Sequence, residues 1–385
     1  MIKFAPWSRP EKFLILEALP ERTRGLLLSV DAEKNLQVRR FWEEFPVAKL
    51  SRRVPWEFGG TKIILAADPS LAFTVFVPVK LEREPAAAKE QLGILELENL
   101  LAQSIGKVFS QCRKQAGQAL RVGELETVLV GSRVRNFKVD GHKVVNPLGF
   151  QGKKIEAVLE LTLTTRKIFE SWKSFFSTRE KFFFTESARA WLTSLEKAGA
   201  ATVNLITFRP ETTSFFILEP AATGTVIYRG KLDWETNRLL ESITSSLGVS
   251  RSLAEELYGR YLRGETSSSG ARWIDRILKP VLDSLFHAMK KTRLRGPIYV
   301  DTMTPLPIAL PKRRGKIVLT ALPLASLVEK LGFTLQPSRH NLSDTQLFRH
   351  LAPFLEFYYD KSDSSINHKL WRRLHWLGPP EARQM

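Results

Sequence analysis

The order of strand-like and helical segments repeats along the chain, and this repetition constrains the fold more than any other feature. The first set has strand patterns over residues 26–79, a helical pattern over 92–119 and further strands over 124–165. The second set has strands over 202–228, which are followed by helices over 234–291. Two meanders of strands, each followed by helices, predict a duplicated α/β architecture with a helix-and-strand module inserted in the first half.

The length of the chain supports a division into several parts, because 385 residues exceed what a single ordinary core accommodates. We predict a first subdomain at 1–83, an inserted module at 84–165, a second half at 166–345, and a linker with a C-terminal helix at 346–385.

The net charge of +18 is the strongest compositional signal, and it favours polyanionic partners such as nucleic acid or anionic lipid. The basic residues lie in short scattered clusters without zinc-finger or RNA-binding signatures, so nucleic acid is not favoured. The single cysteine, Cys112, excludes a disulfide framework and indicates a reducing cytosol. We expect a cytoplasmic protein with no metal site, no signal peptide and no transmembrane helix.

The loop at 139–152 carries the most specific motif, in which an Asp-Gly turn is followed by Asn-Pro and two spaced glycines. It resembles a signature of FtsA, the bacterial cell-division actin homologue. The resemblance implies an actin-like fold, meaning a duplicated ribonuclease-H-like α/β fold with an inserted SHS2-type 1C subdomain. PilM-type pilus-assembly proteins share that architecture. The resemblance makes the following residues a 1C interaction loop: Asp140, Gly141, Asn146, Pro147, Gly149 and Gly152.

The same resemblance implies two glycine-and-hydroxyl hairpins that hold nucleotide phosphates, because backbone N–H groups must approach a phosphate closely. The first hairpin is expected at 31–35 and the second at 204–213, and neither retains its glycines. The segment at 301–305 also lacks glycine, and Tyr258 stands where the family has a lysine. Five residues remain as degenerate nucleotide-binding candidates: Asp31, Lys34, Thr212, Thr213 and Glu255.

These losses predict no catalytic residues and no cofactor, with a weak ATPase using ATP and Mg²⁺ as the alternative. Asp31 has a second interpretation as a plain turn residue, and the two threonines as the start of a strand. The histidines form no catalytic or metal-binding pattern, and we expect His340 and His350 to be surface residues.

The C-terminal segment follows a Ser-rich spacer at 361–365 and places apolar residues on one face of a helix with only basic charges beside them. This pattern predicts a helix that contacts an anionic membrane; the alternative is a helix that docks on the protein's own core. The predicted contact residues are Lys369, Leu370, Trp371, Arg372, Arg373, Leu374 and Leu377.

Together these features predict an FtsA-like scaffold and membrane tether on the inner face of the cell membrane. The resemblance implies an FtsZ-like or other division or envelope protein as partner, and self-association through the 1C subdomain. The alternatives are a PilM-like envelope or pilus-assembly protein, a weak ATPase and, less favoured, a basic nucleic-acid-binding protein.

Overall fold

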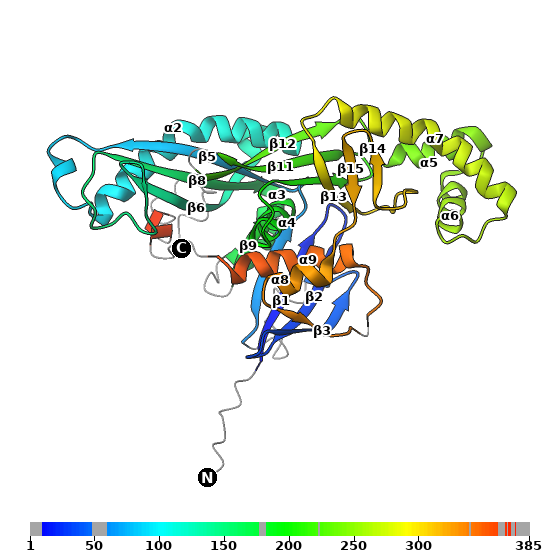
Figure 1. Cartoon of the computed structure of the whole chain (residues 1–385), viewed down its shortest axis with the longest axis horizontal. Helices are drawn as coiled ribbons and strands as arrows, with labels where there is room; N and C mark the ends of the chain where they lie inside the picture. The colour runs from blue at the N-terminus through cyan, green and yellow to red at the C-terminus, as the bar shows by residue number, and fades with distance from the viewer. Residues whose placement is uncertain are drawn as a thin grey trace, which may run out of the picture. The chain divides into compact units, whose positions relative to one another are not determined.

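The computed structural model describes residues 10–47, 60–176, 182–221, 224–338, 340–360, 366–367, 369–370 and 374 (Figure 1). The chain forms two compact units. The first comprises residues 1–198, 220–226 and 325–385, and the second comprises residues 199–219 and 227–324.

The first unit is built on a mixed sheet with the strand order β16-β3-β2-β1-β4-β9. Its strands are β1 (Glu11–Ala18), β2 (Thr23–Val30), β3 (Asn35–Trp42), β4 (Lys62–Ala67), β9 (Phe182–Glu186) and β16 (Thr334–Leu335). β1, β2 and β3 form an antiparallel meander, whereas β4 runs parallel to both β1 and β9. Central strand β1 is buried on both faces over Phe13–Leu16, so it reads as a continuous apolar run rather than an alternating one.

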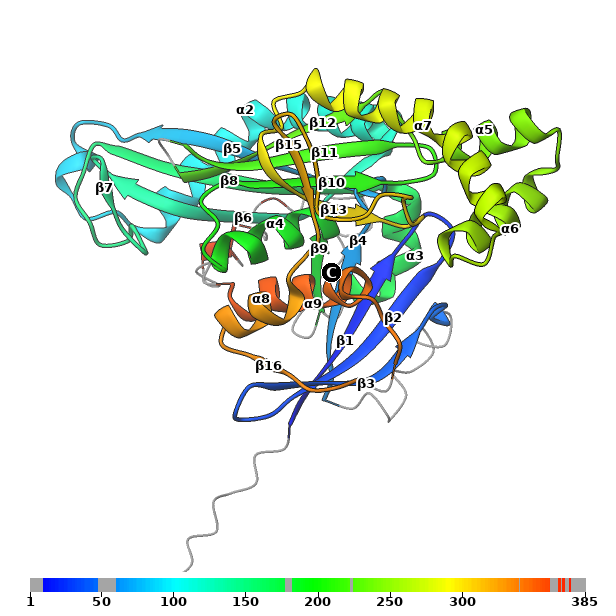
Figure 2. The ribbon, with the colours of Figure 1, turned by 45° about the vertical axis from the view of Figure 1, so that its right-hand side comes forward.

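Besides helix α2 (Ile94–Leu120) of the inserted module, the described part of this unit contains, wholly or largely, the helices α3 (Arg166–Phe176), α4 (Ser187–Lys197), α8 (Leu324–Lys330) and α9 (Asp344–Tyr358). α9 lies against β1 and α4 (Figure 2). Phe354 is edge-on to Phe13 at 4.9 Å between ring centroids, and Phe348 is edge-on to Trp191 at 4.7 Å. A capping box at Ser343 starts this helix.

Helix α9 corrects two sequence-based expectations. The part of the chain from 346 onward does not begin as a linker, because α9 is a core helix whose residues 347–356 are all buried. His350 is buried rather than on the surface, and its Nδ1 lies 3.1 Å from the carbonyl oxygen of Gln346. Burial lowers the pKa of His350, since a charged imidazole is disfavoured away from water.

The inserted module is a four-stranded antiparallel sheet with the order β5-β8-β6-β7. Its elements are β5 (Ala72–Glu82), η2 (Ala87–Lys89), α2 (Ile94–Leu120), η3 (Glu124–Glu126), β6 (Thr127–Val139), β7 (His142–Lys143) and β8 (Lys154–Thr165). The apolar face of α2 covers one face of this sheet and forms the module's core with it (Figure 1). Because β5 pairs with β8 along its whole length, the module begins near residue 72 rather than at 84.

The second unit contains a sheet with the order β12-β11-β10-β13-β15-β14. Its strands are β10 (Val203–Phe208), β11 (Thr213–Ala221), β12 (Gly224–Leu232), β13 (Gly296–Thr302), β14 (Lys312–Arg314) and β15 (Ile317–Thr320). Helices α5 (Asn237–Leu247), α6 (Arg251–Leu262) and α7 (Ser268–Lys290) share its core. Trp234 anchors α7 by donating its indole N–H to the carbonyl oxygen of Val281 at 3.0 Å.

Five strands of each sheet are connected in the same order, and the sixth strand (β16 or β14) lies at opposite edges of the two sheets. In each, an antiparallel meander of three strands (β1–β3 or β10–β12) is joined through its first strand to two further parallel strands (β4 and β9, or β13 and β15). This is the duplicated actin-like arrangement, with the inserted module in the first half, that the sequence predicts. Among the described residues, no helix is long and apolar enough to cross a membrane.

Candidate functional site

The matching topology of the two halves shows which hairpins correspond to each other. β1 matches β10 and β2 matches β11, so the β1–β2 turn is the counterpart of the β10–β11 turn. Residues 31–35, predicted as the first phosphate hairpin, are therefore not the counterpart of the β10–β11 turn, because they join β2 to β3. This correspondence is not visible in the sequence, because the fully buried strand β1 lacks the alternation by which an amphipathic strand is recognised.

Asp31 is a turn residue. Its carboxylate accepts hydrogen bonds from the backbone N–H of Glu33 at 3.0 Å, and from the backbone and side chain of Asn35, each at 2.8 Å. The side-chain bond from Asn35 is the main reason that the pKa of Asp31 is lowered. Lys34 has φ of 61° and its ammonium lies over the Phe333 ring, 5.8 Å from the centroid. Both candidates thus serve the β2–β3 turn.

The β1–β2 turn, the counterpart of the β10–β11 turn, contains no glycine. It is closed by a hydrogen bond from the N–H of Leu19 to the carbonyl oxygen of Arg22 at 2.9 Å. Glu17, at the end of β1, is buried and lies 3.7 Å from the guanidinium of Arg24. A buried carboxylate at this point disfavours a phosphate, which carries the same sign of charge.

The β10–β11 turn is occupied by an arginine. The backbone N–H of Arg209 donates to the carbonyl oxygen of Thr212 at 2.9 Å, which places Thr212 in the turn and Thr213 at the start of β11. The guanidinium of Arg209 donates to the Asp301 carboxylate at 2.7 Å, and both side chains are buried. This ion pair joins the carboxyl ends of neighbouring strands β10 and β13, where a glycine turn would leave backbone N–H groups open to a phosphate.

The remaining nucleotide candidate, Glu255, lies on the exposed surface of α6. It pairs with Arg251 one helical turn earlier, at 3.2 Å, and both side chains are more than half exposed. On the same helix, Tyr258 donates its hydroxyl to the carbonyl oxygen of Pro305 at 2.7 Å. The structure therefore brings none of these candidates into a phosphate cradle.

Most of the motif residues in the signature loop at 139–152 have a structural role in shaping its backbone. Asp140 and Gly141 have φ of 47° and 88°, as a tight β6–β7 hairpin turn requires. The Asp140 carboxylate accepts the backbone N–H groups of Lys153 and Lys154, the latter at 2.8 Å. Asn146 accepts the N–H of Leu148 at 2.9 Å across the intervening Pro147. These contacts fold the loop back onto β8.

The two glycines of the loop bring it close to the segment before α2. Gly149 has φ of 81°, and its N–H donates to the carbonyl oxygen of Leu92 at 3.0 Å. At Gly152 a Cβ would lie 2.4 Å from a methyl carbon of Val139, so a side chain does not fit. Buried Arg83 completes the junction by donating to the Gly152 carbonyl oxygen and binding Glu96 with two hydrogen bonds.

The tail departs from the predicted membrane contact at its two central leucines. Leu370 and Leu374 are 0% and 1% exposed and join Ile366 in the core of the inserted module. The side-chain oxygen of Asn367 also accepts the N–H of Val134 on β6 at 2.8 Å. The leucines are thus turned into the protein, as in the alternative of a helix docked on its own core. Lys369 is exposed; Trp371, Arg372, Arg373 and Leu377 lie outside the described residues.

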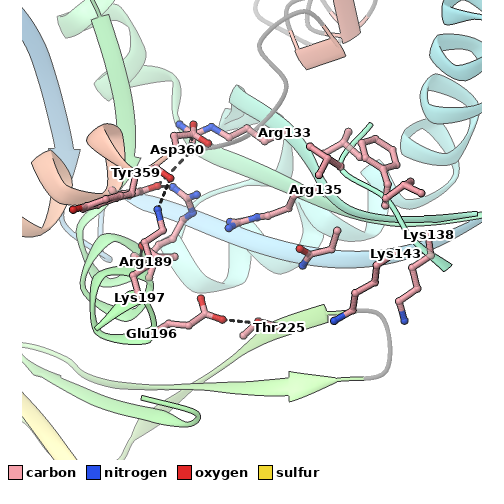
Figure 3. A pocket seen from close by; sticks show the side chains of 17 residues that line it. Arg133, Arg135, Lys138, Lys143, Arg189, Glu196, Lys197, Thr225, Tyr359 and Asp360 are labelled. Atoms are coloured by element: carbon pink, nitrogen blue, oxygen red, sulfur yellow. Dashed lines mark hydrogen bonds and ion pairs between the residues drawn. The ribbon is translucent and has the colours of Figure 1, made fainter. Parts of the chain in front are cut away.

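A pocket of about 480 Å³ lies in the first unit between strand β6 and helix α4 (Figure 3). Figure 3 shows Lys197 on one side of it, Lys138 and Lys143 on the other, and Arg135 between them. Its charged lining residues are Arg133, Arg135, Lys138, Lys143, Arg189, Glu196, Lys197, Glu356 and Asp360.

The floor of the pocket is an ion-pair network around the buried carboxylate of Glu160. Arg189 lies 2.7 Å from this carboxylate, and Arg135 hydrogen-bonds to it. Burial alone would raise the pKa of Glu160, but the charges of Arg135, Arg189 and Arg133 together lower it to about 2. Arg189 also pairs with Glu356, whose other oxygen accepts the Thr185 hydroxyl at 2.7 Å.

A bulge interrupts β6 where it borders the pocket. The register with β8 shifts between Arg135 and Lys138, and Asn136 inside the shift has φ of 58°. A bulge inserts one residue and changes which face the following side chains occupy. Val134 before the shift and Phe137 after it therefore both belong to the module core, and Lys138 lines the pocket as Arg133 and Arg135 do before the shift.

Sequence reasoning missed this pocket. Its one local signal is the Arg-Val-Arg alternation at 133–135, which puts two arginines on one face of a strand. The acidic partners are far away in the sequence, since Arg133 and Glu356 are 223 residues apart and lie 3.3 Å from each other. Among the described residues, no group of three or more histidine, cysteine or acidic side chains is arranged to hold a metal ion.

No family model and no curated protein matches the sequence. Among solved structures, the chain is similar to one titled PilM-PilN type IV pilus biogenesis complex, at 13% identity over 89% of this chain and 96% of that chain, with a TM-score of 0.47. The cytoplasmic domain of EpsL from the type II secretion system of Vibrio cholerae matches at 10% identity over 91% and 96% of the two chains, with a TM-score of 0.31. A Bacteroides thetaiotaomicron protein with an actin-like ATPase fold and unknown function matches at 8% identity over 65% and 81%, with a TM-score of 0.27.

Proposed function

We propose that this protein is an actin-fold scaffold that assembles a cell-envelope machine without turning over ATP. The observation that carries the proposal is the buried Arg209–Asp301 pair, in which the turn equivalent to a phosphate hairpin is closed by a protein side chain. The β1–β2 turn of the other half has no glycine either, and the buried carboxylate of Glu17 stands beside it. An enzyme that transfers phosphate needs donors aimed at the phosphates, and these two turns supply none.

Calorimetry with Mg-ATP, together with a steady-state assay of phosphate release, tests the loss of ATPase function. We expect no turnover in the wild type, and none in Arg209→Ala. Turnover that Arg209→Ala or Asp301→Asn abolished would overturn the proposal. Arg238→Ala is a matched control, because Arg238 lies in the same unit and pairs with exposed Asp233 at 3.0 Å.

Assembly through the inserted module is the second part of the proposal. Three large apolar side chains on the signature loop and at the start of α2 are exposed: Leu95 at 67%, Val145 at 91% and Phe150 at 47%. Exposed apolar side chains on a rigid loop are suited to contact with another protein. We expect sedimentation velocity to show concentration-dependent self-association that Val145→Glu combined with Phe150→Glu abolishes.

Leu253→Glu is the control for this experiment, because Leu253 is exposed to a similar degree, at 41%, on α6 of the other unit. If the wild type, the double variant and Leu253→Glu self-associate equally, the inserted module is not the surface through which the protein assembles. The pilus and secretion proteins named in the comparison identify the partners to test first. Co-purification with inner-membrane pilus or secretion components, rather than with a division filament, is the expected result.

Membrane contact is the third part, and the docked tail sets a condition on it. The apolar side chains of Leu370 and Leu374 face the module core, so lipid binding requires the tail to leave that site. We expect liposome sedimentation to depend on residues 366–385 and to increase in Val134→Pro, which removes the N–H that Asn367 accepts. If deletion of residues 366–385 leaves sedimentation unchanged, the tail is not the membrane anchor.

A further inference from the structure

We propose that the pocket between β6 and α4 is a binding site for a phosphate-bearing small molecule that spans it, with its anionic group at the ammonium of Lys197 and its other end toward Lys143. This inference does not depend on the scaffold function, because it rests on the charges and the size of the pocket and not on the exposed apolar surface of the module, with which the pocket shares Val145.

The floor is electrically balanced. Its three arginines, Arg133, Arg135 and Arg189, face three carboxylates, Glu160, Glu356 and Asp360, through contacts of 3.7 Å or less. Because each of these charges has an opposite charge beside it and most of the side chains are buried, the floor holds its geometry without a ligand. The arginines therefore add little net attraction, and selectivity for an anion has to come from the rim.

The rim carries an excess of positive charge. Lys138 and Lys143 come from β6 and β7, Lys197 comes from the end of α4, and the rim carboxylate is Glu196. Glu196 already accepts the Thr225 hydroxyl at 2.5 Å. With Glu160 beneath them included, the side chains of the pocket carry six positive and four negative formal charges, a net charge of +2. The arginines of this pocket form ion pairs, while Asp360 and Glu196 act on Lys197 through their charges.

Lys197 is placed to gain from a bound anion. Its ammonium donates to the carbonyl oxygen of Tyr359 at 2.6 Å and has two further N–H groups to offer. Burial, and then the neighbouring charges of Arg135 and Arg189, outweigh the effect of Asp360 and lower the pKa of Lys197 to about 8. An anion beside this ammonium would restore the electrostatic stabilisation that burial removes.

The space suits an organic phosphate better than a bare ion. A volume of about 480 Å³ is typical of small-molecule sites and exceeds what one phosphate fills. Val144, Val145 and Tyr359 contribute to the walls, so an apolar or planar group attached to the phosphate has surface to contact. Figure 3 shows that a ligand has to extend across the pocket to reach Lys197 from Lys143.

Isothermal titration calorimetry of the full chain with AMP, inorganic phosphate and adenosine tests the proposal. We expect AMP to bind, adenosine not to bind, and Lys197→Met to weaken AMP binding about tenfold or more, because one charge-assisted hydrogen bond is lost. Lys143→Met is a second test variant. Because the Lys143 side chain is exposed, this substitution does not disturb the packing of the core. Lys107→Met removes the same charge from an exposed position on α2 and is expected to change nothing.

Two outcomes separate the possible sources of the anion. Equal affinities for AMP and inorganic phosphate would mean that the protein contacts the phosphate alone. Tighter binding of AMP would mean that the apolar walls also contact the nucleoside. No binding of either at millimolar concentration overturns the proposal. So does AMP binding that both Lys197→Met and Lys143→Met leave unchanged, because AMP would then bind elsewhere on the chain.

Proton uptake gives a readout that a structural effect of the lysine would not reproduce. Burial lowers the pKa of Lys197 to about 8, and a bound phosphate would raise it again. Titrations at pH 8 in two buffers with different ionisation enthalpies should therefore show proton uptake when AMP binds. Uptake of the same size in Lys197→Met would refute the role of this lysine.

Discussion

Replacement of Glu160 by glutamine should destabilise the first unit more than any other single loss of charge in it. Glu160 is 2% exposed and lies at the centre of the network formed with Arg133, Arg135 and Arg189. Glutamine keeps the size of the side chain but removes its charge, which leaves buried guanidinium groups with fewer partners. Breaking a buried ion pair in this way costs about 3–5 kcal/mol.

The pKa of Glu160 provides a second route to the magnitude. Burial opposes the shift, but the three arginines lower this pKa from its ordinary value of 4.5 to about 2. A carboxyl group whose pKa falls on folding stabilises the folded state above its unfolded pKa. That contribution is lost as the pH falls from about 4.5 to about 2. At about 1.4 kcal/mol for each pH unit, the contribution of the charged group is about 3 kcal/mol.

Urea unfolding monitored by pulsed hydrogen exchange and mass spectrometry measures this loss, because peptides from β6 and β8 report on the first unit alone. The control is Glu156→Gln on the same strand, whose partner Lys154 lies 3.5 Å away and is 42% exposed, so a change below about 1 kcal/mol is expected. The difference between wild type and Glu160→Gln should shrink as the pH falls from 5 to 2.5. A constant difference, or a loss below about 1 kcal/mol at pH 7, would show that the network does not stabilise the fold as argued.

Three further predictions concern the inserted module. Gly152→Ala should cost about 1–3 kcal/mol because its Cβ would lie 2.4 Å from Val139, whereas Gly106→Ala on α2, with nothing within 4 Å, should stabilise; urea unfolding compares them. Leu370→Ala should cost about 2–5 kcal/mol and raise hydrogen exchange in α2, since Leu370 is fully buried; unchanged exchange would mean that the tail is not docked. Cys112, whose pKa burial raises to about 11, should react with a thiol reagent only as fast as the module opens, so equally fast labelling of native and unfolded protein would contradict its burial.

The parts of the fold that the sequence predicts are those whose signal is local. The β-meanders alternate or carry turn residues, and the N-cap at Ser250 accepts the N–H of Leu253 at 3.3 Å as expected for the start of a helix. Strand β1 and helix α9 were missed because they are buried on nearly every side. A segment surrounded by protein needs no polar face, and the periodicity that distinguishes a strand or helix from a loop disappears.

The functional residues differ in the same way. The sequence predicts the signature loop because adjacent residues such as Asp140 and Gly141 determine its turn. The pocket was not found, because Glu160 and Arg189 come from different elements and only the fold brings them to 2.7 Å. The counterpart of the β10–β11 turn was missed for a related reason. Its position depends on which strand is central in the sheet, and the sequence around Leu19 does not reveal that.

The docked tail has a consequence for the order of events during synthesis. The core of the inserted module contains Ile366, Leu370 and Leu374, yet its last strand, β8, ends at Thr165. The ribosome adds about 5–20 residues per second, so roughly 200 further residues take about 10–40 s to appear. During that interval the apolar surface on β6 and α2 is complete except for its final cover. A nascent chain at this stage presents a binding site for a chaperone until Ile366, Leu370 and Leu374 have emerged and packed into the module core.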